Sequence, residues 1–183
     1  MSSDINILHK EAVDLLKELI ATPSFSKEES QTAGIIGKFL AVRGIAATRV
    51  GNNVFALNKY FNESKKTILL NSHHDTVKPN PQYTKDPFSP VVDGDKLFGL
   101  GSNDAGGCLV SLIAAFLYFY DKTDLKYNIA IAATAEEEIS GTGGIEYTLP
   151  YLPAIDCAIV GEPTQMQMAV AERGLMVLDC VSH

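Results

Sequence analysis

The sequence has few cysteines, few basic side chains and no long hydrophobic run, and each shortage excludes a class of protein. Cys108, Cys157 and Cys180 are an odd number and widely spaced, so we expect buried free thiols rather than a disulfide framework. With 15 basic against 22 acidic residues, the net charge of −7 argues against a nucleic-acid partner, which usually meets a basic stripe.

The hydrophobic segments are also short. The longest apolar run, 109–120, is too short to cross a bilayer. The first residues, MSSDINILHKEAVDLL, lack the charged start and the long apolar core of a signal peptide. A chain of 183 residues that is 46% hydrophobic has an ordinary globular composition and can bury a sizeable core. We therefore expect a cytoplasmic protein without a membrane partner.

The chain does contain alternating helical and strand-like hydrophobic patterns. Ser26 and Glu29 have the spacing of a capping box, which predicts that the second helix begins at Ser26. Strands that alternate with helices imply an α/β fold with a mostly parallel mixed sheet flanked by helices. Helices are predicted at 5–20, 26–44, 105–120 and 142–149, and strands at 45–59 (a hairpin), 67–72, 127–135, 155–160, 167–172 and 175–181.

Polar side chains follow four of the strand-like segments. Ligand sites of open α/β sheets lie beyond the carboxyl ends of the strands, so we expect these side chains to converge. Several carboxylates that close would repel one another, at a cost of about 1.4 kcal/mol for each pKa unit shifted, and a divalent metal removes that cost. The four clusters are His73-His74-Asp75, Asp104, Glu136-Glu137-Glu138 and Glu162.

A site of imidazole and carboxylate groups suits zinc, with cobalt or manganese also possible. Two metals about 3.5–4 Å apart need a bridging carboxylate and a bridging water. Asp104, near glycines that let the backbone approach closely, is the best candidate for the bridge. A glutamate that does not bind metal can then take the proton of the water as general base.

Each cluster alone has a simpler explanation. Three successive glutamates are ordinarily a solvated charge run, His73-His74-Asp75 can be a hydrogen-bonded turn, and Asp104 can be a helix N-cap. The segment 99–101 lacks the third glycine of the dinucleotide fingerprint and the Lys-Ser/Thr of a P-loop, which argues against nucleotide binding. The metal hypothesis therefore depends on the four clusters together.

The order of four motifs, NSHHDTV, GLGSNDAGG, ATAEEEISGTGG and VGEPT, resembles the di-zinc aminoacylase and carboxypeptidase family of metallopeptidases. That family includes acetylornithine deacetylase and succinyl-diaminopimelate desuccinylase. The resemblance runs from the N-terminal helix to Arg173-Gly174. It implies a zinc-peptidase-like catalytic domain with two divalent metals, zinc foremost and cobalt possible.

The resemblance also implies roles for the residues that match. His73 corresponds to a histidine ligand, and Asp75 to the aspartate that orients it. His74 is the variable residue between them. Asp104 corresponds to the bridging carboxylate, and Glu162 to a terminal ligand of the metal that His73 binds.

The three glutamates offer two registers on the family's acidic pair. Matching ATAEEE to the frequent Thr-Ala-Asp-Glu-Glu makes Glu137 the general base and Glu138 a metal ligand, with Glu136 in support. The sequence departs from the family pattern at Ala105-Gly106, where Met-Lys is frequent, and at Ser72, where Gly is frequent. No substrate-binding residue is assigned.

Two features of that family have no counterpart in the 183 residues, namely a second histidine ligand and a dimerisation lid domain. We therefore expect a C-terminally incomplete catalytic domain at 1–174, followed by the start of the lid segment at 175–183. A homodimer is expected of the full-length protein.

The reaction that the resemblance implies is hydrolysis of the amide bond of an N-acyl amino acid, a small-molecule substrate. GLGS and VGEPT favour N-acetylornithine, and with it arginine biosynthesis. The alternatives within the family are N-succinyl-ornithine, succinyl-diaminopimelate, acetyl-citrulline and small peptides. The alternative of another class is a metal-binding homologue without catalysis.

Overall fold

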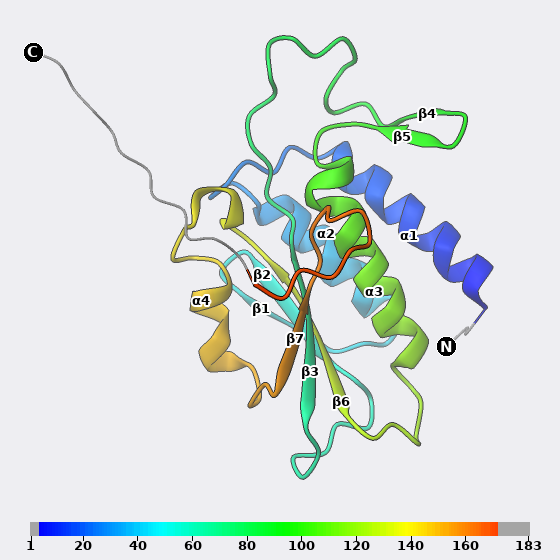
Figure 1. The fold of residues 1–183 in the computed structure, drawn as a ribbon, viewed down its shortest axis with the longest axis vertical. Helices are drawn as coiled ribbons and strands as arrows, with labels where there is room; N and C mark the ends of the chain where they lie inside the picture. The colour runs from blue at the N-terminus through cyan, green and yellow to red at the C-terminus, as the bar shows by residue number, and fades with distance from the viewer. Residues whose placement is uncertain (1–3, 172–183) are drawn as a thin grey trace, which may run out of the picture.

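The centre of the fold is a five-stranded sheet with the strand order β1-β2-β6-β3-β7 (Figure 1). The computed structural model describes residues 4–171. β3 pairs in parallel with β6 and β7, whereas β2 pairs antiparallel with β1 and β6, so β2 alone runs against the other strands of this sheet. The five strands are β1 (Ala47–Val50), β2 (Asn53–Leu57), β3 (Thr67–His73), β6 (Asn128–Thr134) and β7 (Cys157–Val160).

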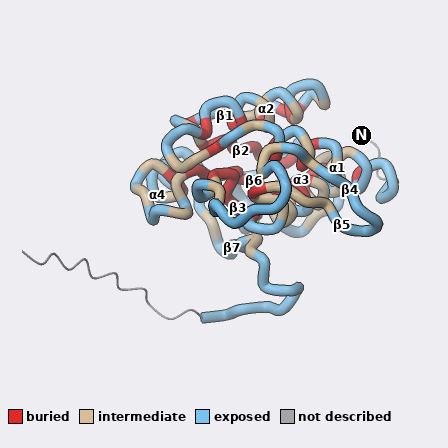
Figure 2. Tube along the Cα trace, turned by 90° about the horizontal axis from the view of Figure 1, so that it is seen from above, coloured by how far each residue is buried: buried red, intermediate tan, exposed pale blue. Residues whose placement is uncertain are grey.

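Helices cover both faces of the sheet, which confirms the predicted α/β class. Side chains alternate along each strand, so that Leu70 and Ile131 pack with the first three helices while Leu69 and Ala130 pack on the other face beside α4. Figure 2 shows the buried residues gathered between these layers. The helices are α1 (Ile5–Ile20), α2 (Ser30–Ala41), α3 (Cys108–Phe119) and α4 (Ile145–Thr148).

The central strand β3 and the edge strand β7 differ sharply in burial. Most residues of β3 are buried, as expected of a parallel strand covered on both faces. All four residues of β7 are exposed. The expectation of buried cysteines is therefore wrong for Cys157, which lies on β7, and Cys108 at the start of α3 is only half-buried. Cys180 lies outside the described residues.

The predicted capping box is wrong. α2 begins at Ser30, and its N-cap residue, Glu29, makes no capping hydrogen bond with its side chain. The Ser26 hydroxyl instead donates to Asp75 Oδ2 over 2.7 Å, and Glu29 is fully buried. Both residues are therefore committed to tertiary contacts rather than to the end of a helix.

Other predicted elements differ at their ends. α3 begins at Cys108 and is preceded by a distorted helical turn, η1 (Ser102–Gly107). Above it lies a small hairpin of β4 (Val91–Asp93) and β5 (Lys96–Phe98). No strand forms over 167–171, and the strand predicted at 175–181 lies outside the described residues.

One helical segment of the described residues, Ser102–Phe119, is long and apolar enough to cross a membrane by length and composition alone. It is longer than the apolar run that the sequence analysis considered. Leu109 and Phe116 are nevertheless fully buried in the main core. The side chains of this segment thus have the packing of a core helix in an α/β domain.

Candidate metal centre

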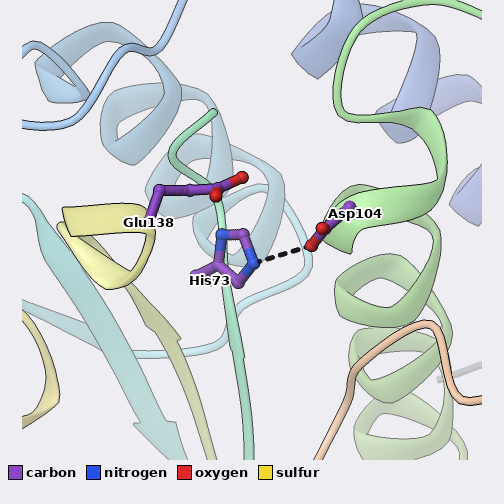
Figure 3. Close-up of side chains that lie close together, drawn as sticks. All are labelled: His73, Asp104 and Glu138. Carbon is purple, nitrogen blue, oxygen red and sulfur yellow. Dashed lines mark hydrogen bonds and ion pairs between the residues drawn. The ribbon is translucent and has the colours of Figure 1, made fainter. Parts of the chain in front are cut away.

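The carboxyl ends of the sheet strands bring the predicted site residues together. His73 ends β3, and ligand atoms of His73, Asp104 and Glu138 all lie within 4.8 Å of one another (Figure 3). Glu137 Oε2 and Glu162 Oε2 lie 3.7 and 3.8 Å from His73 Nε2. The convergence predicted from strand ends is therefore confirmed, while the role of each residue stays a prediction.

The two nitrogens of His73 have different partners. Nδ1 lies 3.0 Å from the carbonyl oxygen of Asp75 and 3.4 Å from its Oδ1, so Nδ1 is the nitrogen that carries a hydrogen. Nε2 faces Asp104 Oδ1 at 3.2 Å. With the proton held on Nδ1, the lone pair of Nε2 points into the carboxylate cluster, which is the arrangement of a metal-ligating histidine.

Asp104 comes from the turn η1 rather than from the end of a helix. Its φ of −111° and ψ of 103° are not helical, and the N-cap of α3 is Gly107, which has no side-chain capping bond. The N-cap explanation of Asp104 is therefore wrong. The Asp104 side chain is 56% exposed and directs its carboxylate at His73 (Figure 3).

The three glutamates form a tight turn after β6. Glu136 has left-handed backbone angles, φ 57° and ψ 21°, and the short 3-10 turn η2 (Glu137–Ile139) follows. The amides of Glu137 and Glu138 donate to Asp75 Oδ1 and Oδ2 over 3.1 and 3.2 Å. This turn is thus no solvated charge run, because its backbone is tied to the buried carboxylate beside the histidine.

The electrostatics of the cluster follow from crowding. Burial opposes protonation of His73, but the hydrogen bond and charge of Asp75, with the nearby glutamates, outweigh it and raise the pKa of the ring to about 9. Burial, together with the charges of the neighbouring carboxylates, raises the pKa of Glu162 to about 7. Burial and Asp104 likewise raise the pKa of Glu138.

The chemistry of this donor set fits a divalent cation. One imidazole nitrogen with a free lone pair and several carboxylates in reach match the ligands of zinc, cobalt or manganese. A bound cation would replace the proton that the crowded carboxyl of Glu162 otherwise keeps near neutral pH. The residues present therefore suit the metal that the sequence analysis expects.

Asp75 is fully committed to holding this site. Burial raises its pKa, but hydrogen bonds from His73, Ser26 and two backbone amides outweigh burial and lower the pKa overall. Its side chain is fully buried. It therefore stays ionised in the position that orients His73.

The sequence analysis missed a second set of residues behind the site. His74 Nε2 lies 3.0 Å from the carbonyl oxygen of Asn52, and Nδ1 lies 2.9 Å from Thr32 Oγ1. Glu29 joins this set through Asn52 Nδ2, at 2.8 Å. No spacing rule points to these residues, since they come from separate elements and Glu29 fits a capping box equally well.

A groove of about 320 Å³ lies beside the cluster. Asp104 and Glu138 form one wall, and Val77 and Tyr83 from the loop after β3 line it as well. The space is large enough for a small polar substrate to reach the cluster.

The fold and the cluster together define an α/β domain with the histidine and carboxylate set of a metal-dependent hydrolase. The sequence profile of Peptidase family M20/M25/M40 matches residues 69–173. The chain belongs to this family, whose profile covers three of the strand-end clusters and the glutamate turn.

The curated relatives it matches include proteins named acetylornithine deacetylase. One from Pectobacterium atrosepticum is 32% identical over 179 residues, which cover 90% of this chain and 46% of that protein. One from Salmonella arizonae is 33% identical over 177 residues, covering 88% and 45%. The chain thus spans about half the length of the curated relatives it matches.

Solved structures share the fold. Human carnosine dipeptidase 1 superposes with a TM-score of 0.72 at 20% identity, over 86% of this chain and 39% of that one. A metallo-carboxypeptidase of the M20 family from Sulfolobus solfataricus gives 0.68 at 24% identity, over 82% and 37%. A dinuclear metal-binding peptidase of the M20 family from Bacillus subtilis gives 0.64 at 19% identity, over 85% and 43%.

Proposed function

We propose that the full-length protein hydrolyses the amide bond of N-acyl amino acids at this centre, with two divalent cations, zinc foremost. The observation that carries the proposal is the orientation of His73. Its Nδ1 is held by Asp75, and its Nε2 faces the carboxylates of Asp104, Glu137 and Glu162 within 3.8 Å.

Asp104 is proposed as the bridging ligand, with His73, Glu138 and Glu162 as terminal ligands. Bound there, divalent cations lower the pKa of a water toward neutrality and polarise the substrate carbonyl. Asp75 keeps the proton of the ring on Nδ1, so that Nε2 stays free to bind.

Glu137 is proposed as the general base. Its carboxylate faces the cluster, and its side chain is 54% exposed, which leaves it open to a water and to substrate. It accepts the proton of the attacking water and then returns it to the leaving amine. The acyl group leaves as a carboxylate and the amino acid as a free amine.

N-acetylornithine is the proposed substrate, which would place the protein in arginine biosynthesis. The support is the 32–33% identity to proteins named acetylornithine deacetylase. Dipeptides are the second candidate, favoured by the likeness in fold to carnosine dipeptidase 1 and to a yeast di-peptidase. We further propose a cytoplasmic homodimer in which residues 1–174 are the first part of the catalytic domain.

The test is amine release by the zinc-loaded full-length gene product. N-acetylornithine, N-succinyl-ornithine, N-succinyl-diaminopimelate and carnosine are offered side by side at pH 7.5. We expect release from N-acetylornithine at least about 100-fold faster than from the others, a difference of about 2.7 kcal/mol in transition-state binding. Release from another of the four changes the substrate and keeps the reaction. Metal uptake without release from any substrate would favour a homologue that binds metal without catalysis.

A further inference from the structure

We propose that Glu29 is a positioning residue that fixes the turn Glu136–Glu138 and thereby holds Glu137 and Glu138 at the metal centre. The effect on catalysis rests on the proposed function, whereas the effect on the turn does not. Glu29 has an exposed fraction of 0% and lies 107 residues before the turn that it contacts.

The contacts of Glu29 connect three separate parts of the chain. Oε1 accepts the amide hydrogens of Lys27, over 2.6 Å, and of Glu136, over 3.2 Å. Oε2 accepts from Asn52 Nδ2 over 2.8 Å. Both oxygens therefore act as acceptors, and a side-chain amide in this place would put an N–H group against an N–H group.

The backbone of Glu136 needs such a restraint. Its left-handed angles are uncommon for any residue other than glycine and persist where the surroundings hold them. The Glu136 carbonyl accepts from Gly141 N over 2.8 Å, and its carboxylate accepts from Gly143 N over 3.2 Å. A Cβ at Gly141 or Gly143 would overlap that carboxylate. Glu29 supplies the remaining contact, on the amide of Glu136.

Two buried carboxylates divide the turn between them. The amide of Glu136 donates to Glu29, and the next two amides donate to Asp75. Successive amides in such a turn form a concave anion site, and here protein carboxylates fill it. Glu137 and Glu138 leave the turn toward His73, so a displacement at Glu136 is carried directly into the metal centre.

Asn128 offers a matched control at the opposite end of the sheet. It is 1% exposed, and its Nδ2 donates to the carbonyl oxygens of Asn62 and Lys65 over 2.8 and 3.1 Å. Glu29→Gln and Asn128→Asp exchange the same two groups in opposite directions, each inside a buried network. Both variants lose stability, whereas only the first disturbs the glutamate turn.

The first measurement is amide hydrogen exchange of the metal-free full-length protein, read on the peptide that covers 134–141. We expect exchange at Glu136–Glu138 to rise at least about tenfold in Glu29→Gln relative to the wild type, and to stay unchanged in Asn128→Asp. If Glu29→Gln does not fold, Glu29→Asp carries the same test, because it keeps the charge and shortens the side chain by one methylene group.

The second measurement is cobalt binding, followed by visible absorption. We expect the dissociation constant to rise 10- to 100-fold in Glu29→Gln, with an altered spectrum, and to stay within about twofold in Asn128→Asp. Equal exchange in the two variants, or unchanged cobalt binding in Glu29→Gln, overturns the proposal. A loosened turn and weakened cobalt binding in a protein that hydrolyses no acyl amino acid refute the proposed function and leave Glu29 in its place.

Discussion

His73 and His74 are adjacent in the sequence and both are buried, yet their rings meet opposite surroundings. His73 faces a group of carboxylates, which raise its pKa to about 9 despite burial. His74 is enclosed by neutral partners, Thr32 and the carbonyl of Asn52, and burial lowers its pKa to about 4. The first ring therefore attracts a cation, and the second stays neutral.

The difference teaches how one strand end can be reactive and rigid at once. A neutral His74 carries its proton on Nε2, donates it to Asn52 O and accepts from the Thr32 hydroxyl on Nδ1. His73 keeps a free lone pair on Nε2. The support behind the site is fully hydrogen-bonded, whereas the site itself has charges that only a ligand can balance.

The largest effect is expected on the His73 side, from Glu137→Gln. Removing the general base should lower kcat about 10³-fold, because the amide cannot accept the proton of the water. Zinc content, measured by atomic absorption, should stay unchanged. The control is Glu63→Gln, an exposed glutamate far along the chain, which should retain wild-type kcat. Full activity of Glu137→Gln would mean that the other register of the three glutamates is correct.

The second effect concerns the His74 side and the stability of the metal-free protein. The unfolded chain binds a proton on His74 near pH 6.5, and the folded chain only near pH 4. As the pH falls through this window the unfolded state is favoured, and the gap corresponds to a loss of about 3 kcal/mol. Glu29, Asp75 and His73, which also act on this ring, are present in both proteins compared below.

Urea unfolding of the wild type and of His74→Gln at pH 7, 5.5 and 4.5 measures this loss. Gln does not titrate, so the stability advantage of the wild type should shrink steadily as the pH falls. The titration of His73 is common to both proteins and cancels in the difference. A constant difference across the three pH values would show that His74 is not held neutral.

The sequence predicted the clusters better than it predicted their support. His73, Asp104 and Glu138 could be expected to converge because parallel strands end at one edge of a sheet, and that rule needs only the order of elements. The reference to a family then suggested which glutamate does what. The order of helices and strands followed from hydrophobic period in the same way.

Glu29 and Ser26 could not be placed from the sequence for a physical reason. A serine and a glutamate three residues apart can satisfy the amides of a helix end, or they can reach across the fold to other partners. Local spacing is identical in both cases. Only the position of Asp75 and of the glutamate turn, many residues away, decides between them.

A third and smaller effect sharpens the comparison, again on the His73 side. Asp75→Asn keeps the size of the side chain but replaces one acceptor oxygen with a donor, which faces backbone amides. The dissociation constant of zinc, measured by competition with a chelator, should rise 10- to 100-fold. Asn71→Asp, a change of equal size one turn of the strand earlier, serves as control. A larger loss in the control would refute the special role of Asp75.

The smallest effect is expected from Thr32→Val, which breaks the His74 side without touching a ligand. Thr32 is fully buried, and its loss leaves Nδ1 of His74 without a donor, at a cost of about 1–2 kcal/mol. Chemical unfolding at pH 7.5 should show this loss, while zinc affinity stays within about twofold of the wild type. If Thr32→Val weakened zinc as much as Asp75→Asn, the two histidines would form one coupled unit, and the division between a reactive side and a rigid side would be wrong. An intact zinc affinity with reduced stability is expected, because the contacts of His73 with Asp75 and Asp104 do not pass through Thr32.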